Sequence, residues 1–334
     1  MATTVIIADT GGLNQQRYKA NSCDRSWAVG AGGTLNAEML TTDLVRAGLV
    51  DCRGKWIWVD HDDAGNWGGV ITDSNANDDG TTEIIATEFG TALFGKRLLP
   101  IESTPLYGPA GAVFLQAIVR TEREGHLYVI DRTADEYGEP VQLTLNGQEL
   151  IDGLRAIESA SGQSWQVDPD TFVASWGRTG FDKTGSVQLV APRHIVGYSF
   201  PRSIEPVVNQ LRASVANSVS TRAQMVVAEN AESINALGVR QGSHDFSQDG
   251  SLAAFKPAAQ AIVDQLAKQG LSLECQVVNK DQDRCWGWFR EGDDICILLP
   301  TESSQLDVRV MARSLSDDDQ VMSISAVVTD WTVY

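Results

Sequence analysis

The chain has 334 residues, of which 43% are hydrophobic, and it carries a formal net charge of −18. This length predicts two or three domains, each with an ordinary buried core. The excess of acidic residues excludes a protein that binds nucleic acid by neutralising phosphates, because such proteins need clustered cations.

Cysteine usage and apolar runs indicate the compartment. The five cysteines are scattered and form no CxxC pair, so we expect reduced, structural thiols rather than disulfides or a zinc site. They are Cys23, Cys52, Cys275, Cys285 and Cys296. The apolar run at 4–8 is too short for a leader, and that at 110–119 is too short to span a membrane. We expect a protein made in a cytoplasm, with no membrane segment.

Residues 1–104 are expected to form a first β-barrel-like domain. Alternating apolar residues at 56–60, 67–71 and 82–86 predict an antiparallel meander, separated by turns rich in Asp, Asn and Gly. Residues 4–8 and 34–39 predict two more strands, with a glycine-rich loop at 30–33. Thr42, with Asp43, predicts the cap of a short helix, and a second short helical piece is expected at 91–96.

Residues 105–195 are expected to form an α+β module. Pro109 and the apolar spacing at 113–118 predict a helix that ends before Gly125. Asn146 and Glu149 predict the capping box of a second helix, which has apolar residues at 150, 151, 154 and 157 and ends at Gly162. Strands are expected at 127–130, 141–145, 165–167, 172–176 and 187–190.

Residues 196–334 are expected to form a second β-barrel-like domain containing the longest helix, 251–269, with Pro257 in its first turn. A helical turn is expected at 231–238, and strands at 195–200, 207–215, 221–229, 271–278, 286–289, 295–299, 307–312 and 321–329. The helix-then-strand pattern at 44–60 recurs at 262–278, either by chance or as a duplicated barrel-plus-helix unit. The predicted fold class is α+β, mostly β, with two β-barrel-like domains and an intervening α+β module.

The sequence contains no motif that predicts catalysis. GxSxG, HExxH and the phosphate-binding loop are absent, and the glycines at 30–33 lack the third glycine of a dinucleotide loop. Residues 73–79 resemble the start of a calcium loop, but Asp78 occupies the glycine position and Ile84 the position of the bidentate glutamate. His61 with its neighbouring aspartates fits a solvated turn better than a metal site. We predict no catalytic residues, no cofactor and no metal.

Several phrases occur in a suggestive order between residues 34 and 329. WGGVITD and FGTALFGKRLL lie in the first domain, and NGQELIDGLRAIESASGQSWQVDPD and WGRTGFDKT in the middle module. AENAESINALGVRQG and WFREGDDICILLP follow, with Gly292 and Asp293 opening a turn. In this order they resemble the tail hub proteins of tailed bacteriophages of the long non-contractile type. Those proteins are similar in fold to the baseplate hub of contractile tails and injection systems.

The resemblance implies a homotrimer whose six barrels (2 × 3) form a pseudo-sixfold ring on the tail tube, while the other domains face a threefold tip. It implies a virion protein of the tail tip or baseplate. The expected partners are a tube-end ring protein, the tape-measure protein, and tail tip or fibre proteins. DNA would pass through the ring without specific binding, since three chains carry 3 × (−18) = −54 formal charges.

Two sets of residues are candidates for assembly and for the channel. The candidate interface residues, for which core packing is the alternative, are Trp56, Trp58, Trp67, Trp286 and Trp288. The candidate acidic turns facing the channel, for which plain solvated loops are the alternative, contain Asp60, Asp62, Asp63, Asp78, Asp79, Asp317, Asp318 and Asp319. A rival function is a carbohydrate-binding or carbohydrate-degrading β protein of the tail tip, which would use tryptophan stacking and paired carboxylates.

Overall fold

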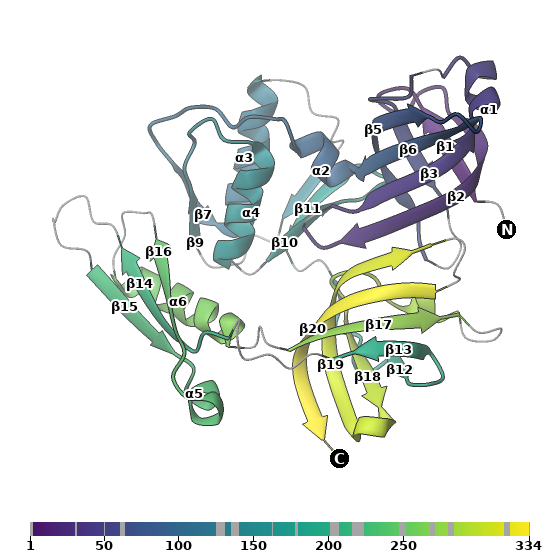
Figure 1. The fold of residues 1–334 in the computed structure, drawn as a ribbon. Coiled ribbons are helices and arrows are strands. Elements are labelled where there is room, and N and C mark those ends of the chain that lie inside the picture. Colours follow the sequence, from purple (N-terminus) through teal and green to yellow (C-terminus); the bar gives the residue numbers. More distant parts are fainter. Residues whose placement is uncertain are drawn as a thin grey trace.

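The fold is described from a computed structural model, and it is mostly β. The structure describes residues 3–30, 32–49, 51–60, 64–124, 131–134, 140–161, 163–177, 180–200, 207–215, 224–246, 252–267, 271–279, 284–316 and 321–333. These residues form one 12-stranded sheet and three smaller sheets. Figure 1 shows two curved β units beside each other, with two mixed αβ units attached.

The first barrel is a closed, six-stranded unit. Its strands are β1 (Thr4–Ala8), β2 (Gln16–Ala28), β3 (Thr34–Leu40), β4 (Trp56–Val59), β5 (Trp67–Ala76) and β6 (Thr81–Glu88). Their hydrogen-bonded order is β1-β4-β5-β6-β3-β2, and β2 pairs back onto β1. The meander expected from the sequence is therefore confirmed as β4-β5-β6.

Two features of the first barrel differ from the sequence expectations. The 13-residue strand β2 occupies a stretch in which no strand was predicted, because its buried residues, such as Cys23 and Trp27, are separated by charged and small polar ones. Pairing with β1, β3 and β19 holds it extended. The helix α1 (Thr41–Arg46) follows Leu40 without a side-chain cap, so the predicted Thr42 cap is wrong.

The middle module is built on three helices and two small sheets. Its elements are α2 (Phe89–Phe94), β7 (Leu106–Pro109), α3 (Ala110–Glu124), β8 (Asp131–Ala134), β9 (Pro140–Leu143), α4 (Leu150–Ser161), β10 (Ser164–Val167) and β11 (Val173–Gly177). The sheets β10-β11-β8 and β7-β9 and the helices share one core, which includes the four expected apolar residues of α4.

The start of α4 was misplaced by the sequence pattern. The Asn146 side chain accepts a hydrogen bond from the backbone N–H of Gln148, and the helix begins only at Leu150. The intervening residues instead bridge to the strand-like stretch before β7, through Leu98 with Glu149. The strand expected at 127–130 and the stop at Gly162 lie outside the described residues.

The second barrel consists of β12 (Gln188–Val190), β13 (Ile195–Ser199), β17 (Ser272–Val278), β18 (Asp294–Leu299), β19 (Ser304–Leu315) and β20 (Val321–Val333). Their order is β12-β18-β19-β20-β17-β13, with no pairing between β12 and β13 in the described part of the chain. The strand predicted at 286–289 is wrong: Cys285–Trp288 is the 3₁₀ helix η1. Trp286 folds this segment back by donating its indole N–H to Val277 O.

A small αβ unit lies in the chain between β13 and β17. It contains β14 (Gln210–Val215), β15 (Gln224–Glu229), α5 (Ala231–Leu237), β16 (Gln241–Phe246) and α6 (Leu252–Leu266). The sheet β15-β14-β16 packs with α6 around a core of its own. No strand was predicted at β16, because QGSHDF has no apolar alternation; its parallel pairing with β14 makes it one.

The two barrels are duplicates in strand order. β1, β2, β3, β4, β5 and β6 correspond in chain order to β12, β13, β17, β18, β19 and β20, and both sets follow the same order around the barrel. They differ at one strand, since β12 is parallel to β18 whereas β1 is antiparallel to β4. The helices are not duplicated as the sequence suggested: α1 precedes β4, but α6 precedes β17, whose counterpart is β3.

Candidate assembly site at the junction of the two barrels

The barrels are joined edge to edge within one chain. The last residues of β2 pair antiparallel with the last residues of β19, from Arg25 opposite Leu315 to Ala28 opposite Ala312. Val29 extends this pairing by donating its N–H to Met311 O at 3.0 Å. The contact is possible because β19 continues beyond Arg309, the last residue that pairs with β18. One continuous sheet therefore crosses from one barrel to the other.

Arg313 fastens this junction from within. Its side chain is buried, and its Nε and Nη2 donate to Glu291 Oε2 at 3.0 and 2.7 Å. Its Nη1 lies 3.3 Å from Ala64 O and 3.2 Å from Phe289 O, and its guanidinium stacks on the ring of Trp27. A buried guanidinium is tolerated when its donors are satisfied and a carboxylate compensates its charge. This one connects both barrels.

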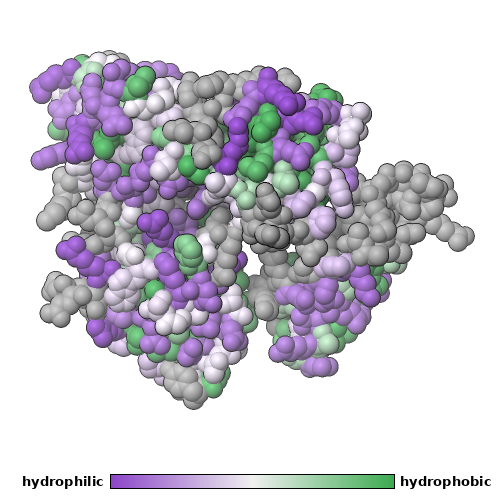
Figure 2. All heavy atoms as spheres, turned by 180° about the vertical axis from the view of Figure 1, so that it is seen from behind, coloured by the Kyte–Doolittle hydropathy of each residue, from purple (hydrophilic) through white to green (hydrophobic). Residues whose placement is uncertain are grey.

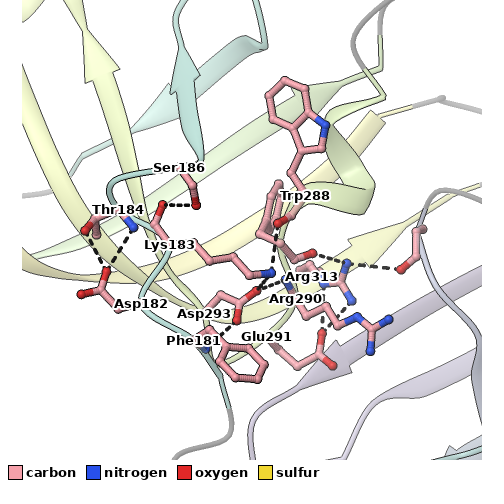
Figure 3. Close-up of polar contacts among 12 residues, drawn as sticks. Phe181, Asp182, Lys183, Thr184, Ser186, Trp288, Arg290, Glu291, Asp293 and Arg313 are labelled. Atoms are coloured by element: carbon pink, nitrogen blue, oxygen red, sulfur yellow. Dashed lines mark hydrogen bonds and ion pairs between the residues drawn. The ribbon is translucent and has the colours of Figure 1, made fainter.

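Asp293 forms a second fastening point, between the second barrel and the end of the middle module. Its carboxylate is buried and accepts the backbone N–H groups of Phe181 and Arg290, both at 2.8 Å. Lys183 Nζ completes the set at 2.7 Å from Asp293, and it also donates to Trp288 O. Figure 3 shows these side chains converging between the two segments.

Two segments that are far apart in the sequence therefore come into contact here. Gly180 lies so close to Gly292 that a Cβ on Gly180 would overlap the Gly292 backbone. Gly292 has a φ of +88°, which favours glycine, and Asp293 follows it. The sequence indicated the turn at Gly292 and Asp293 but not its partner segment, since no local pattern records which loops approach each other.

The junction borders a cavity of about 630 Å³ that contains both carboxylates and cations. Glu88 lies in its wall and accepts the N–H of Gly33. The pKa of Glu88 is raised to about 7, chiefly by burial and also by the charge of Glu291, while the Gly33 N–H and Arg313 oppose the rise. No group of three or more metal-ligating side chains occurs among the described residues.

Four of the five candidate tryptophans are buried in the chain, as the core-packing alternative supposes. Trp56 and Trp58 project from β4 against Phe89 of α2, at 4.9 and 5.4 Å between ring centroids. Trp67 fills the first barrel and Trp286 the second. Trp288 remains 37% exposed beside the Asp293 cluster.

The structure describes only some of the residues in the candidate acidic turns. Asp60 is exposed and borders the junction cavity. Asp78 and Asp79 are exposed in the β5–β6 turn, where hydrogen bonds from the Thr81 side chain and backbone lower the pKa of Asp79. The remaining candidates lie outside the described residues: Asp62, Asp63, Asp317, Asp318 and Asp319.

The joined sheet has a concave face with a mixed polar and apolar lining. A groove of about 480 Å³ runs over β13, β17, β20, β19 and β2. Its lining includes many short polar side chains, among them Ser26, Ser199, Ser314, Ser323 and Ser325. The face seen in Figure 2 carries hydrophobic residues in small groups among hydrophilic ones, not one broad apolar patch.

The cysteines and helices add two observations. All five cysteines lie in the described residues, are buried and form no disulfide, and burial raises the pKa of Cys275 to about 12, which disfavours the reactive thiolate. Within the part of the chain that the structure describes, no helix is long and apolar enough to cross a membrane.

Comparison with solved structures gives the chain a known fold. It is similar to a 43 kDa tail protein of prophage MuSo2 from Shewanella oneidensis (TM-score 0.71, 12% identity, covering 97% of this chain and 98% of that one). A tail protein from Neisseria meningitidis MC58 matches equally well (0.71, 13%, 99% and 97%). Prophage tail protein gp18 from Listeria monocytogenes EGD-e follows (0.68, 12%, 98% and 94%).

These similarities extend over nearly the whole of each chain, so the chain has the fold of these tail proteins. No family model and no curated protein sequence matches it.

Proposed function

We propose that this chain is a structural protein of a phage-type tail, a trimeric hub that joins the sixfold tail tube to the threefold tail tip. Three chains supply six barrels around one axis, and the other units follow threefold symmetry. Its partners are further copies of itself, the tube-end ring protein, the tape-measure protein, and tip or fibre proteins. Its place is the virion, at the tail tip or baseplate.

The observation that carries this proposal is the duplication of the barrel within one chain. Both barrels have one strand order and are fused through a single β2–β19 edge pairing. A chain with two equivalent modules placed side by side can present six equivalent modules when three chains close a ring. The match to prophage tail proteins over the full length of the chain supports the same conclusion.

We further propose that DNA and the tape-measure protein pass along the concave face of the joined sheet. That face contains serines, Gln276 and the carboxylate of Glu274. The net charge of −18 per chain disfavours retention of a polyanion, since no counterions are released on contact. The acidic turn at Asp78 and Asp79 is a second candidate for the channel wall.

The rival function, carbohydrate binding or degradation, is less favoured. Sugar stacking needs exposed aromatic faces, and Trp56, Trp58, Trp67 and Trp286 are each at most 8% exposed. We therefore propose an assembly role without catalysis.

The mass of the particle in solution tests the proposal. Light scattering of the purified chain is expected to yield a trimer of about 109 kDa (3 × 36.2 kDa). Electron microscopy of these particles is expected to show a ring with an axial opening. A 36.2 kDa species at every concentration, with measurable glycan affinity, would favour the rival instead.

A further inference from the structure

We propose that the outer edge of β5, over residues 72–76, pairs with the β13 end of the second barrel of a neighbouring copy of this chain. This inference rests on the proposed ring and specifies the strands by which its subunits meet. The reasoning starts from the contact already made inside one chain, between β2 and β19. Each of these strands has a counterpart in the other barrel, and among the residues that the structure describes the two counterparts make no such contact.

The first pair of counterparts is β5 and β19. Each runs antiparallel to the next strand, β6 or β20; the β5–β6 pairing has one register shift and the β19–β20 pairing has two. In β5 the register shifts between Ile71 and Asp73; in β19 the corresponding shift lies between Val310 and Ala312. Residues 73–76 of β5 therefore match residues 312–315 of β19, which are those that pair with β2.

The loops beside the two bulges agree as well. Ile71 exchanges backbone hydrogen bonds with the loop before β4, donating to Lys55 O at 2.9 Å and accepting from Gly54 N at 2.8 Å. Val310 does the same with the loop before β18, donating to Asp293 O at 2.9 Å and accepting from Gly292 N at 2.7 Å. These hydrogen bonds therefore support the correspondence of β5 and β19 independently of the strand order.

The second pair of counterparts is β2 and β13. β2 pairs with β3 and shifts register between Ala20 and Ser22, while β13 pairs with β17 and shifts between Ile195 and Gly197. β2 uses its other edge to contact β19. On its side away from β17, β13 pairs with no strand in the described residues, and Val196, at its bulge, is 54% exposed.

The β5 edge has the properties of a strand acceptor. β4 covers β5 only over Trp67–Val70, and residues 72–76 pair on that side with no described strand. Asn77 donates its N–H to Thr81 O at 2.8 Å, so by the alternation of an antiparallel pair the N–H groups of Ser74 and Ala76 face away from β6. Exposed edges of this kind accept further strands.

The open edge of β5 lies away from the second barrel of its own chain. In Figure 1, β2 is the strand of the first barrel nearest the second barrel, whereas β5 is labelled on the opposite side. If the β2–β19 pairing is repeated between copies, β5 of one copy therefore pairs with the next copy. A heterologous contact of this kind closes into a ring when its rotation matches that between the two barrels.

A matched pair of substitutions at one residue tests this contact. Ala76→Pro removes the outward N–H at an exposed position, while Ala76→Ser keeps it. We expect Ala76→Pro to raise the dissociation constant of the trimer at least about tenfold, as the loss of a backbone hydrogen bond and close approach implies, and Ala76→Ser to leave it unchanged. Light scattering over a dilution series measures both, and circular dichroism checks the fold.

Hydrogen exchange of the unmodified chain provides a second readout that needs no variant. The amides of Ser74 and Ala76, whose N–H groups face away from β6, are expected to be protected in concentrated, trimeric samples and to exchange freely in dilute ones. A wild-type trimer in which these amides stay unprotected, or in which Ala76→Pro changes nothing, would refute the β5 contact and leave the hub intact. A wild-type chain that never associates would refute both.

Discussion

Glu88 is expected to make the stability of the barrel junction depend on pH. Its carboxyl is buried at the junction cavity with a pKa of about 7, against an ordinary value of 4.5. The folded chain therefore binds more protons than the unfolded chain between these values, so the free energy of unfolding falls as pH rises from 4.5 through 7. The perturbation that removes this effect is Glu88→Gln, which retains an oxygen to accept the Gly33 N–H.

The expected magnitude follows from the two pKa values. Their difference, 7 − 4.5, is 2.5 pKa units, and at 1.36 kcal/mol per unit this is about 3 kcal/mol. We expect Glu88→Gln to match the wild type at pH 4.5 and to exceed its free energy of unfolding by up to about 3 kcal/mol at pH 8.5. Shared contributions from other carboxylates cancel in the difference between the two proteins.

Urea unfolding followed by tryptophan fluorescence at several pH values measures this difference. Protein concentration is held constant, because self-association also contributes to stability. Glu83→Gln, on the same strand but outside the junction, is the matched control and should show the pH dependence of the wild type. The reasoning is refuted if the gap between Glu88→Gln and wild type stays constant from pH 4.5 to 8.5, or if the variant is the less stable at high pH.

Three further predictions concern the polar fastening of the junction, each checked by urea unfolding at pH 7. Gly180→Ala places a Cβ against the Gly292 backbone and should cost about 1–3 kcal/mol, whereas Gly185→Ala, which has open space, should be nearly neutral. Arg313→Met leaves Glu291 without its partner and should cost about 3 kcal/mol, with partial recovery on adding Glu291→Gln. Asp293→Ala leaves two backbone N–H donors and Lys183 without their acceptor and should lower the free energy of unfolding by about 2–4 kcal/mol.

Each of these has a result that would contradict it. Equal unfolding midpoints for the two glycine variants would mean that the close approach of the segments is not required. If Glu291→Gln restores no stability to Arg313→Met, the loss of stability comes from packing rather than from an uncompensated charge. An Asp293→Ala chain as stable as Asp182→Ala, an exposed carboxylate change in the same segment, would remove Asp293 from the fastening.

The mostly β fold and much of the element order followed from local sequence patterns. Alternation identified β4 to β6, because residues such as Ile57 and Val59 must point into a core while their neighbours point elsewhere. The apolar spacing of α4 identified its buried face for the same reason. Each of these patterns arises because one face of a single segment packs against the core. The sequence of that segment alone therefore shows the pattern.

Which strands and loops pair with one another is not encoded in the sequence of any single segment. β2 and β16 are strands because neighbouring edges pair with them, although their side chains alone suggest loops. Trp286 alternates as if in a strand, yet its hydrogen bond to Val277 O holds a 3₁₀ turn. The meeting of Gly180 with Gly292, and the capture of Asp293 by Phe181 N and Lys183, join residues more than a hundred positions apart. Only the folded arrangement specifies them, because backbone hydrogen bonding and close packing act between whichever segments the topology brings together.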